Sequence, residues 1–162
     1  MPARTTLGHV CVLLCLVIFS AAEATSNDAL GYEPERFEVH EIASGLVQPM
    51  EVDIGPDGEI YLIELGGVLK VIDPHTGAGT QIGKLAVTTE QENGLIGLAL
   101  DPDFASNRWL YLQYSPPDFS GQHVSRFTLT DGMLDLESEK VLFTYEEQRL
   151  QCCHHAGSLE FG

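Results

Sequence analysis

The sequence predicts an all-β protein of short antiparallel strands, and three observations carry that prediction. Stretches of five or six residues alternate apolar and polar side chains, as half-buried strands do. Turn motifs containing Pro, Asp or Gly separate them, at residues 55–58, 73–77 and 101–104. The Pro-Asp turns at Pro56 and Pro102 lie 46 residues apart, and each precedes a strand with a Tyr-Leu pair. A four-stranded unit repeating at this length is typical of a β-propeller, while a β-sandwich stays the alternative.

The first unit occupies residues 37–77. Its turn at 55–58 is well specified, because Pro56 presets φ, Asp57 bonds its own backbone and Gly58 accepts a positive φ. Strands are predicted at residues 37–42, 49–54, 59–64 and 68–72.

A second unit follows the Gly-rich stretch at residues 92–97. Residues 131–140 have a helix-tolerant composition, but Leu134 and Leu136 alternate with acidic residues, which favours a strand. No long helix is expected anywhere. Strands are predicted at residues 95–100, 109–114, 123–129 and 141–145.

The N-terminus has the pattern of a secretory signal peptide. Arg4 precedes an apolar run of 13 residues at 10–22, which is too short for a stable membrane span, and Ala-Glu-Ala at 22–24 suits cleavage. We therefore expect residues 1–24 to be a signal peptide and 25–36 a polar leader. The propeller part is expected at 37–162, in the periplasm or secreted, with no membrane span.

Charge and cysteine content exclude several classes of protein. The formal net charge is −16, with the acidic residues scattered along the chain, which argues against nucleic acid and anionic membranes as partners. Without the signal peptide only Cys152 and Cys153 remain, so no disulfide framework is expected.

The most reactive side chains gather at the end of the chain, where Cys152 and Cys153 run into His154 and His155. Structural zinc sites space their cysteines and histidines apart, and four consecutive strand residues alternate faces and cannot converge on one ion. A c-type haem site needs two residues between the cysteines. No metal site is therefore predicted in this run.

Three motifs resemble, in order, those of the soluble sugar dehydrogenases that depend on pyrroloquinoline quinone (PQQ), the glucose/sorbosone dehydrogenase family. The first is Gly-Leu-Val-Gln-Pro at 45–49 with Gly-Pro-Asp-Gly-Glu-Ile-Tyr-Leu at 55–62. The second is Glu-Asn-Gly-Leu-Ile-Gly-Leu-Ala at 92–99. The third, His-His-Ala-Gly-Ser-Leu-Glu-Phe-Gly at 154–162, is similar to the family's His-x-x-Gly-x-Leu-x-Phe-Gly motif.

The resemblance implies a six-bladed propeller, of which this chain would be the first blades, incomplete and unclosed. It places His154 at the catalytic histidine, which removes a proton from the sugar hydroxyl while hydride passes to PQQ. Imidazole suits this role because its ordinary pKa leaves it neutral at neutral pH. Glu92 and Cys153 would lie at the cofactor. The family also implies calcium, whose ligands would lie beyond Gly162, a small sugar substrate and an external electron acceptor.

Two positions depart from the family pattern. Glu92 stands where well-known members have a Gln that contacts the cofactor, and a carboxylate there repels an anionic quinone unless it is protonated or bridged by a cation. Cys153 stands where they have an Asp. A vicinal Cys152–Cys153 disulfide against the cofactor is one interpretation, although such a bond is strained.

Two other functions stay open at this point. A secreted propeller can bind carbohydrate or protein without catalysis, because fold does not determine function. A propeller hydrolase of the lactonase type is the other alternative.

Overall fold

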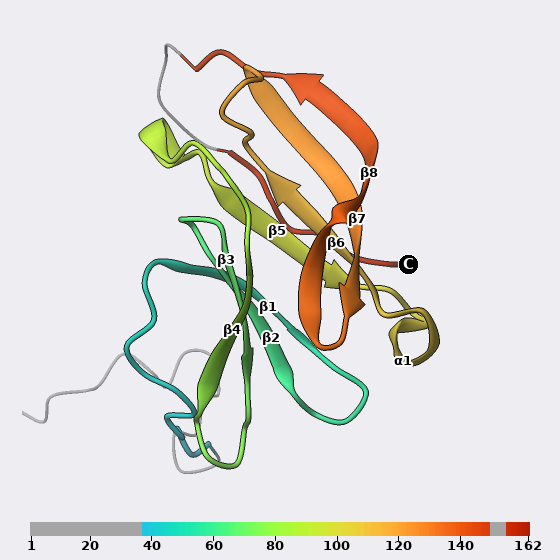
Figure 1. The fold of residues 1–162 in the computed structure, drawn as a ribbon. Coiled ribbons are helices and arrows are strands. Elements are labelled where there is room, and N and C mark those ends of the chain that lie inside the picture. Colours follow the sequence, from blue (N-terminus) through green and yellow to red (C-terminus); the bar gives the residue numbers. More distant parts are fainter. Residues whose placement is uncertain (1–36, 150–154) are drawn as a thin grey trace, which may run out of the picture. The chain divides into compact units, whose positions relative to one another are not determined.

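The computed structural model describes residues 37–149 and 155–162. The chain forms two units, Met1–Val39 and His40–Gly162, and the second holds every element described below (Figure 1). The first sheet contains β1 (Pro49–Ile54), β2 (Ile60–Glu64), β3 (Val68–Ile72) and β4 (Gly79–Lys84). The second contains β5 (Leu95–Leu100), β6 (Trp109–Tyr114), β7 (Gly121–Thr130) and β8 (Met133–Glu146). A 3₁₀ turn (Glu90–Glu92) precedes β5, and a short helix α1 (Phe104–Asn107) follows it.

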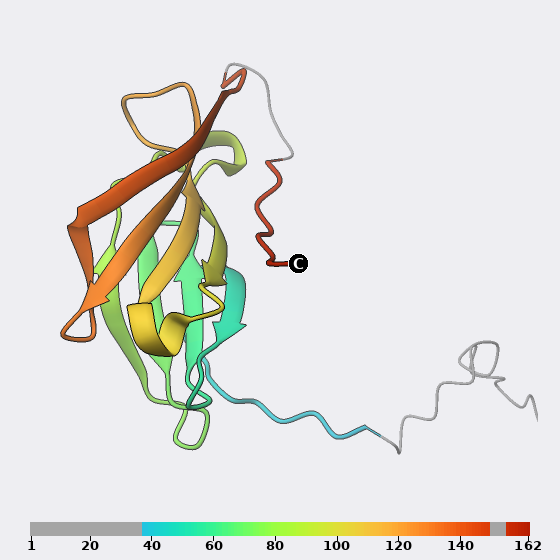
Figure 2. The same cartoon turned by 90° about the vertical axis from the view of Figure 1, so that its right-hand side faces the viewer.

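Each sheet is an antiparallel meander with its four strands in chain order. Figure 2 shows β1 and residues 155–162 on one side of the fold and the outer strands β4 and β8 on the other. Successive four-stranded meanders with their first strands on the same side are the arrangement of neighbouring propeller blades. The prediction of an all-β, unclosed fold is confirmed.

Most strand predictions are confirmed, and β1, β3, β5 and β6 have the predicted bounds. The strand predicted at 37–42 is wrong, because residues 37–46 carry no strand and the side chain of Val39 is 96% exposed. Alternation produces a strand only where a neighbouring strand and a core cover one face. The fourth strand of the first sheet is instead β4, whose sequence Gly-Thr-Gln-Ile-Gly-Lys has a single apolar residue, Ile82.

An apolar core fills the space between the two sheets. Its side chains alternate along the strands, which gives each sheet one face towards the other. Gly83 of β4 leaves room for Leu134 of β8, since a Cβ at Gly83 would lie 2.8 Å from Cδ2 of Leu134. The fully buried members are Ile63, Leu69, Leu95, Leu98, Leu110, Leu112 and Phe127.

The edge strand β8 is irregular. It joins β7 through a two-residue turn in which Asp131 and Gly132 both have positive φ, as a tight hairpin requires. Its register with β7 then shifts twice, between Val124 and Ser125 and between Arg126 and Thr128. Bulges of this kind twist an edge strand and hinder further pairing.

Two carboxylates of β1 join the sheets at their first strands. Backbone N–H groups of β5 donate to them, from Leu98 to Oε2 of Glu51 (2.6 Å) and from Leu100 to Oδ2 of Asp53 (2.8 Å). Because β1 and β5 belong to different sheets, these side chains take the place of a backbone ladder.

Removing the carboxylate at this junction should destabilise the protein. We expect Glu51→Ala to lower the free energy of unfolding by about 1–3 kcal/mol, because the Leu98 N–H is then left without its acceptor. Urea denaturation measures the change. Glu137→Ala, which removes an exposed acidic side chain of β8, is the control. Equal midpoints for the two variants would show that the junction contributes nothing.

Glu64 at the end of β2 fixes the chain where it enters the first sheet. Its side chain is 4% exposed, and its Oε1 accepts from Lys70 Nζ (2.5 Å) and from the Val47 N–H (2.8 Å). Burial acts to raise the pKa of Glu64, but the hydrogen bonds from Lys70 and Val47 and the lysine charge outweigh it and lower the pKa. The carboxylate is therefore a stabilising group while it is ionised.

Acid should remove this contribution. A carboxyl whose pKa is lower in the folded state stabilises the protein above its unfolded pKa, and the effect disappears as the pH falls through the folded pKa. We expect the unfolding free energy of Glu64→Gln to be lower than that of the wild type at pH 7 by roughly 1–3 kcal/mol. The gap should close below about pH 4. Urea titrations between pH 3 and 7 test this, and a constant gap over that range would contradict it.

Candidate active site

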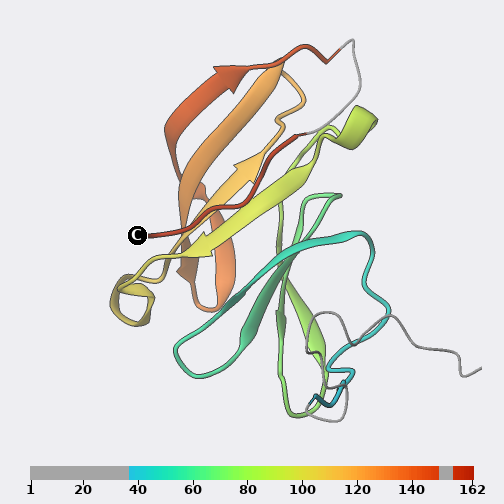
Figure 3. The ribbon, with the colours of Figure 1, turned by 180° about the vertical axis from the view of Figure 1, so that it is seen from behind.

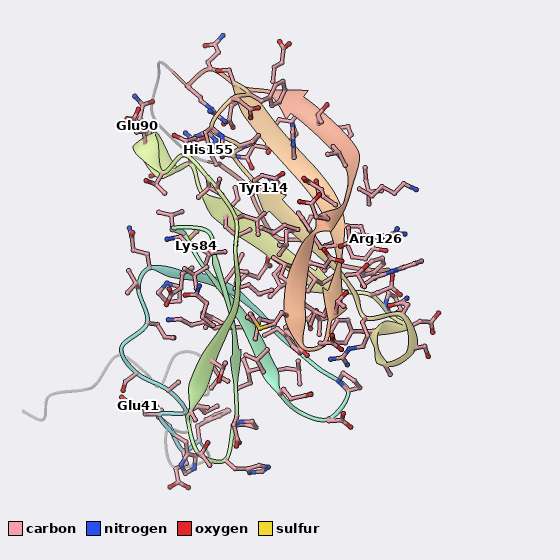
Figure 4. The ribbon with its side chains drawn as sticks, viewed as in Figure 1. Glu41, Lys84, Glu90, Tyr114, Arg126 and His155 are labelled. Atoms are coloured by element: carbon pink, nitrogen blue, oxygen red, sulfur yellow. The ribbon has the colours of Figure 1, made fainter. Side chains whose placement is uncertain are left out.

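Three segments meet at one end of the second sheet. They are the 3₁₀ turn Glu90–Glu92 with the start of β5, the residues after β8, and the C-terminal segment 155–162. Figures 1 and 3 show the C-terminal segment running beside β5. In Figure 4 the side chains of Glu90 and His155 lie at the same end of the fold. We call this end the rim.

The turn before β5 presents Glu92 at the surface of the rim. Glu92 is exposed and has a φ of 69°, and Gly94 after it has a φ of 157°. Asn93 between them is 2% exposed, and its Nδ2 donates to the carbonyl oxygen of Glu90 (2.6 Å). Its Oδ1 is buried and has no partner among residues 37–149 and 155–162. The turn therefore holds a buried acceptor directly behind Glu92.

The C-terminal segment touches β5 backbone to backbone. A Cβ on Gly97 would collide with the carbonyl oxygen of Gly157, and a Cβ on Gly157 would collide with that of Ile96. Farther along, the Phe161 ring packs edge-on against Tyr111, with ring centroids 5.1 Å apart. The close approach brings the Glu92–Gly97 motif and the residues after His154 to one place.

Residues 155–162 do not form the strand that their sequence suggests. Exposure alternates along the first six of them, from half-buried His155 to exposed Glu160, as on a half-buried strand. Within the described residues, however, no neighbour completes a backbone ladder with this segment, and ladder bonds define a strand.

A buried glutamine attaches the segment to the second sheet. Gln113 of β6 is 6% exposed, and its Nε2 donates to the carbonyl oxygen of Ala156 (2.6 Å), to the Tyr145 hydroxyl (2.9 Å) and to Oε1 of Gln122 (3.1 Å). Burial raises the pKa of Tyr145, and the charge of Glu147 adds to the effect.

A carboxylate and an imidazole continue this cluster. Oε2 of Glu147 lies 2.8 Å from Nδ1 of His155 and accepts from Nε2 of Gln122 (3.2 Å). Its Oε1 accepts from Nε of Arg149 (3.4 Å). The Arg149 guanidinium also donates to the carbonyl oxygens of Pro116 (3.0 Å) and Gly121 (2.8 Å). These contacts join the loop before β7, the end of β8 and the C-terminal segment.

Of the predicted site residues, only Glu92 lies within the described part of the chain, where it is exposed at the rim. His154, Cys153 and Cys152 lie outside it. Sequence reasoning missed Gln113, Glu147 and His155. One signal was available, because Gln113 is an uncharged polar residue within an otherwise apolar and aromatic strand.

Two further properties concern the described residues alone. Within them, no three His, Cys, Asp or Glu side chains come together in a way that could hold a metal ion. No helix there is long and apolar enough to cross a membrane.

The two successive four-stranded meanders define the class of protein as a β-propeller. The model of the Glucose / Sorbosone dehydrogenase family matches residues 46–162. The chain belongs to this family, whose members among the relatives below are oxidoreductases.

Similar proteins share the fold and part of the sequence. Quinoprotein glucose dehydrogenase B of Acinetobacter calcoaceticus is 30% identical over 115 residues, which cover 68% of this chain and 24% of that protein. The PQQ-bound aldose sugar dehydrogenase of Streptomyces coelicolor has a TM-score of 0.60 at 24% identity, over 66% of this chain and 33% of its own. A putative glucose dehydrogenase of Thermus thermophilus has a TM-score of 0.64 at 24% identity, over 74% and 35%.

The chain thus spans about a quarter to a third of the length of the relatives that it matches. The family's fold is a propeller, and the two blades described here match one part of it.

The glycine contact offers a test of the rim geometry. We expect Gly157→Ala to push the C-terminal segment off β5, at a cost of about 1–3 kcal/mol, because the new methyl group meets backbone that has no room to give. Limited chymotryptic cleavage after Leu159 should then be at least about tenfold faster.

Gly66→Ala is the matched control, because a Cβ at Gly66 meets nothing within 4 Å. Equal rates of cleavage after Leu159 in the two variants would contradict the close packing.

Proposed function

We propose that this chain is the N-terminal part of an exported quinoprotein that oxidises the hydroxyl group of an aldose sugar, with His154 as the general base. The observation that carries the proposal is the anchoring of residues 155–157 beside the Glu92–Gly97 motif. It supports a common site for the second and third family motifs. The family match over residues 46–162 supports the chemistry.

His154 has the side chain that the reaction needs. Oxidising a hydroxyl group to a carbonyl removes one proton from oxygen and one hydride from carbon. A neutral imidazole nitrogen accepts the proton, and a positioned base of this kind contributes roughly 10²–10⁴ in rate. The bound quinone supplies the hydride acceptor.

The described rim fits such a cofactor in part. Its positive-φ turn at Glu92 lets backbone approach a planar ligand closely, and the buried Oδ1 of Asn93 is an acceptor that can receive a donor. Its charge does not match a quinone that carries several carboxylates, because Glu92 is acidic and Arg149 is engaged by Glu147 and by two carbonyl oxygens. Basic residues or a calcium ion from other parts of the protein would balance the charge, as the family resemblance implies.

The remaining parts of the proposal rest on the sequence. Residues 1–24 act as the signal peptide, residues 25–36 as a leader, and residues 37–162 as the first blades, which places the enzyme in the periplasm or outside the cell. An external acceptor reoxidises the quinone. Cys153 lies at the cofactor, either as a free thiol or in a disulfide with Cys152.

Replacing the proposed base should abolish activity. With the protein expressed from its complete gene and loaded with PQQ and calcium, we expect His154→Ala to lower aldose-dependent dye reduction by about 10²–10⁴. Quinone binding, followed by absorbance, should persist.

His75→Ala is the control, since His75 is exposed in the turn after β3. Full activity in His154→Ala would show that another group is the base. A folded, quinone-loaded wild type that oxidises no aldose would favour the binding propeller, and hydrolysis of a lactone by it would favour the lactonase.

A further inference from the structure

The pair formed by Glu147 and His155 has no role in the function proposed above. Their side chains are 9% and 11% exposed. Charged carboxylates are seldom buried unless specific donors face them. Here three donors do so, from His155, Gln122 and Arg149. Such an arrangement maintains one geometry, because the loss of any one donor leaves part of a buried charge unsatisfied.

The Glu147 carboxylate determines which nitrogen of the His155 ring carries a proton and how the ring is oriented. Nδ1 of His155 faces Oε2 at 2.8 Å, so Nδ1 carries a proton and the ring plane is held. Nε2 is buried and has no partner in the described part of the chain. The ring is therefore oriented by Glu147 at one nitrogen and enclosed by protein at the other.

The position of His155 in the sequence gives this pair its significance. His155 directly follows His154, and the next residue, Ala156, is held by Gln113 through its carbonyl oxygen (2.6 Å). Gly157 then packs on the backbone of β5. Three successive residues are thus held, His155 by its contact with the Glu147 carboxylate, Ala156 by a hydrogen bond and Gly157 by a backbone contact. Because His155 is joined to His154 by a peptide bond, fixing His155 limits the positions that the preceding residue can take.

We propose that Glu147 and His155 form a positioning pair that orients His154, and that Gln113 supports it through Ala156. The inference rests on the function proposed above. Neither residue of the pair exchanges a proton with the substrate. Their effect is on the placement of the base, where misplacement by about 1 Å can cost roughly 100-fold in rate.

The test compares two neighbouring glutamates in the protein expressed from its complete gene and loaded with PQQ and calcium. Glu147→Gln replaces the buried carboxylate, and Glu146→Gln makes the same change at an exposed position of β8. We expect Glu147→Gln to lower kcat for aldose oxidation by about 10- to 100-fold, with KM and quinone affinity within about threefold. Glu146→Gln should match the wild type.

A second pair of variants keeps the test decisive if Glu147→Gln folds poorly. His155→Asn retains an N–H near the position of Nδ1, whereas His155→Leu removes it. We expect His155→Leu to reproduce the fall in kcat and His155→Asn to recover most of it. In the cofactor-free protein, chymotryptic cleavage after Leu159 should be faster in His155→Leu and close to wild type in His155→Asn.

The outcomes separate the two proposals. An active wild type in which Glu147→Gln and His155→Leu keep their kcat overturns the positioning role and leaves the proposed function intact. A wild type that binds quinone but oxidises no aldose overturns the proposed function, and the positioning role with it. A change in KM or in quinone affinity alone, with kcat unchanged, would also contradict positioning of the base.

Discussion

The contact of two β1 carboxylates with the backbone of β5 is the junction on which the rest of the fold depends. The first strands of the two sheets share no backbone ladder, so Glu51 and Asp53 supply the acceptors. The apolar faces of the two sheets meet in one core that includes Leu69 and Leu112. Because β5 also begins at the rim, the same contacts place the turn that carries Glu92.

The next junction uses different chemistry. Between the second sheet and the C-terminal segment, the donor is the side-chain amide of Gln113 of β6 and the acceptor is the backbone carbonyl oxygen of Ala156. Gly97 and Gly157, which have no side chains, let the C-terminal segment approach the backbone of β5 closely. The protein's acidity is partly explained by such roles, since Glu51, Asp53, Glu64 and Glu147 all serve as acceptors inside the fold.

Sequence reasoning predicts strands that are short apolar or aromatic stretches bounded by turn residues, such as β5 and β6. It misses β4, because Ile82 is the only apolar residue there and the strand depends on pairing with β3. It wrongly predicts a strand at 37–42, where alternation meets no core. At the site, the glycine motif reveals the turn before β5. The Gln113–Glu147–His155 cluster is unpredictable, because its members are far apart in the chain and meet only through tertiary packing.

The close contact between Gly97 and Gly157 also fixes how the C-terminal segment is aligned along β5. Only a residue without a side chain fits at this crossing, and Ala156 and Ser158 flank the single glycine on the C-terminal segment. The segment therefore cannot slide by one residue to absorb an insertion or deletion upstream. A change of length between β8 and Gly157 must therefore be taken up before the crossing.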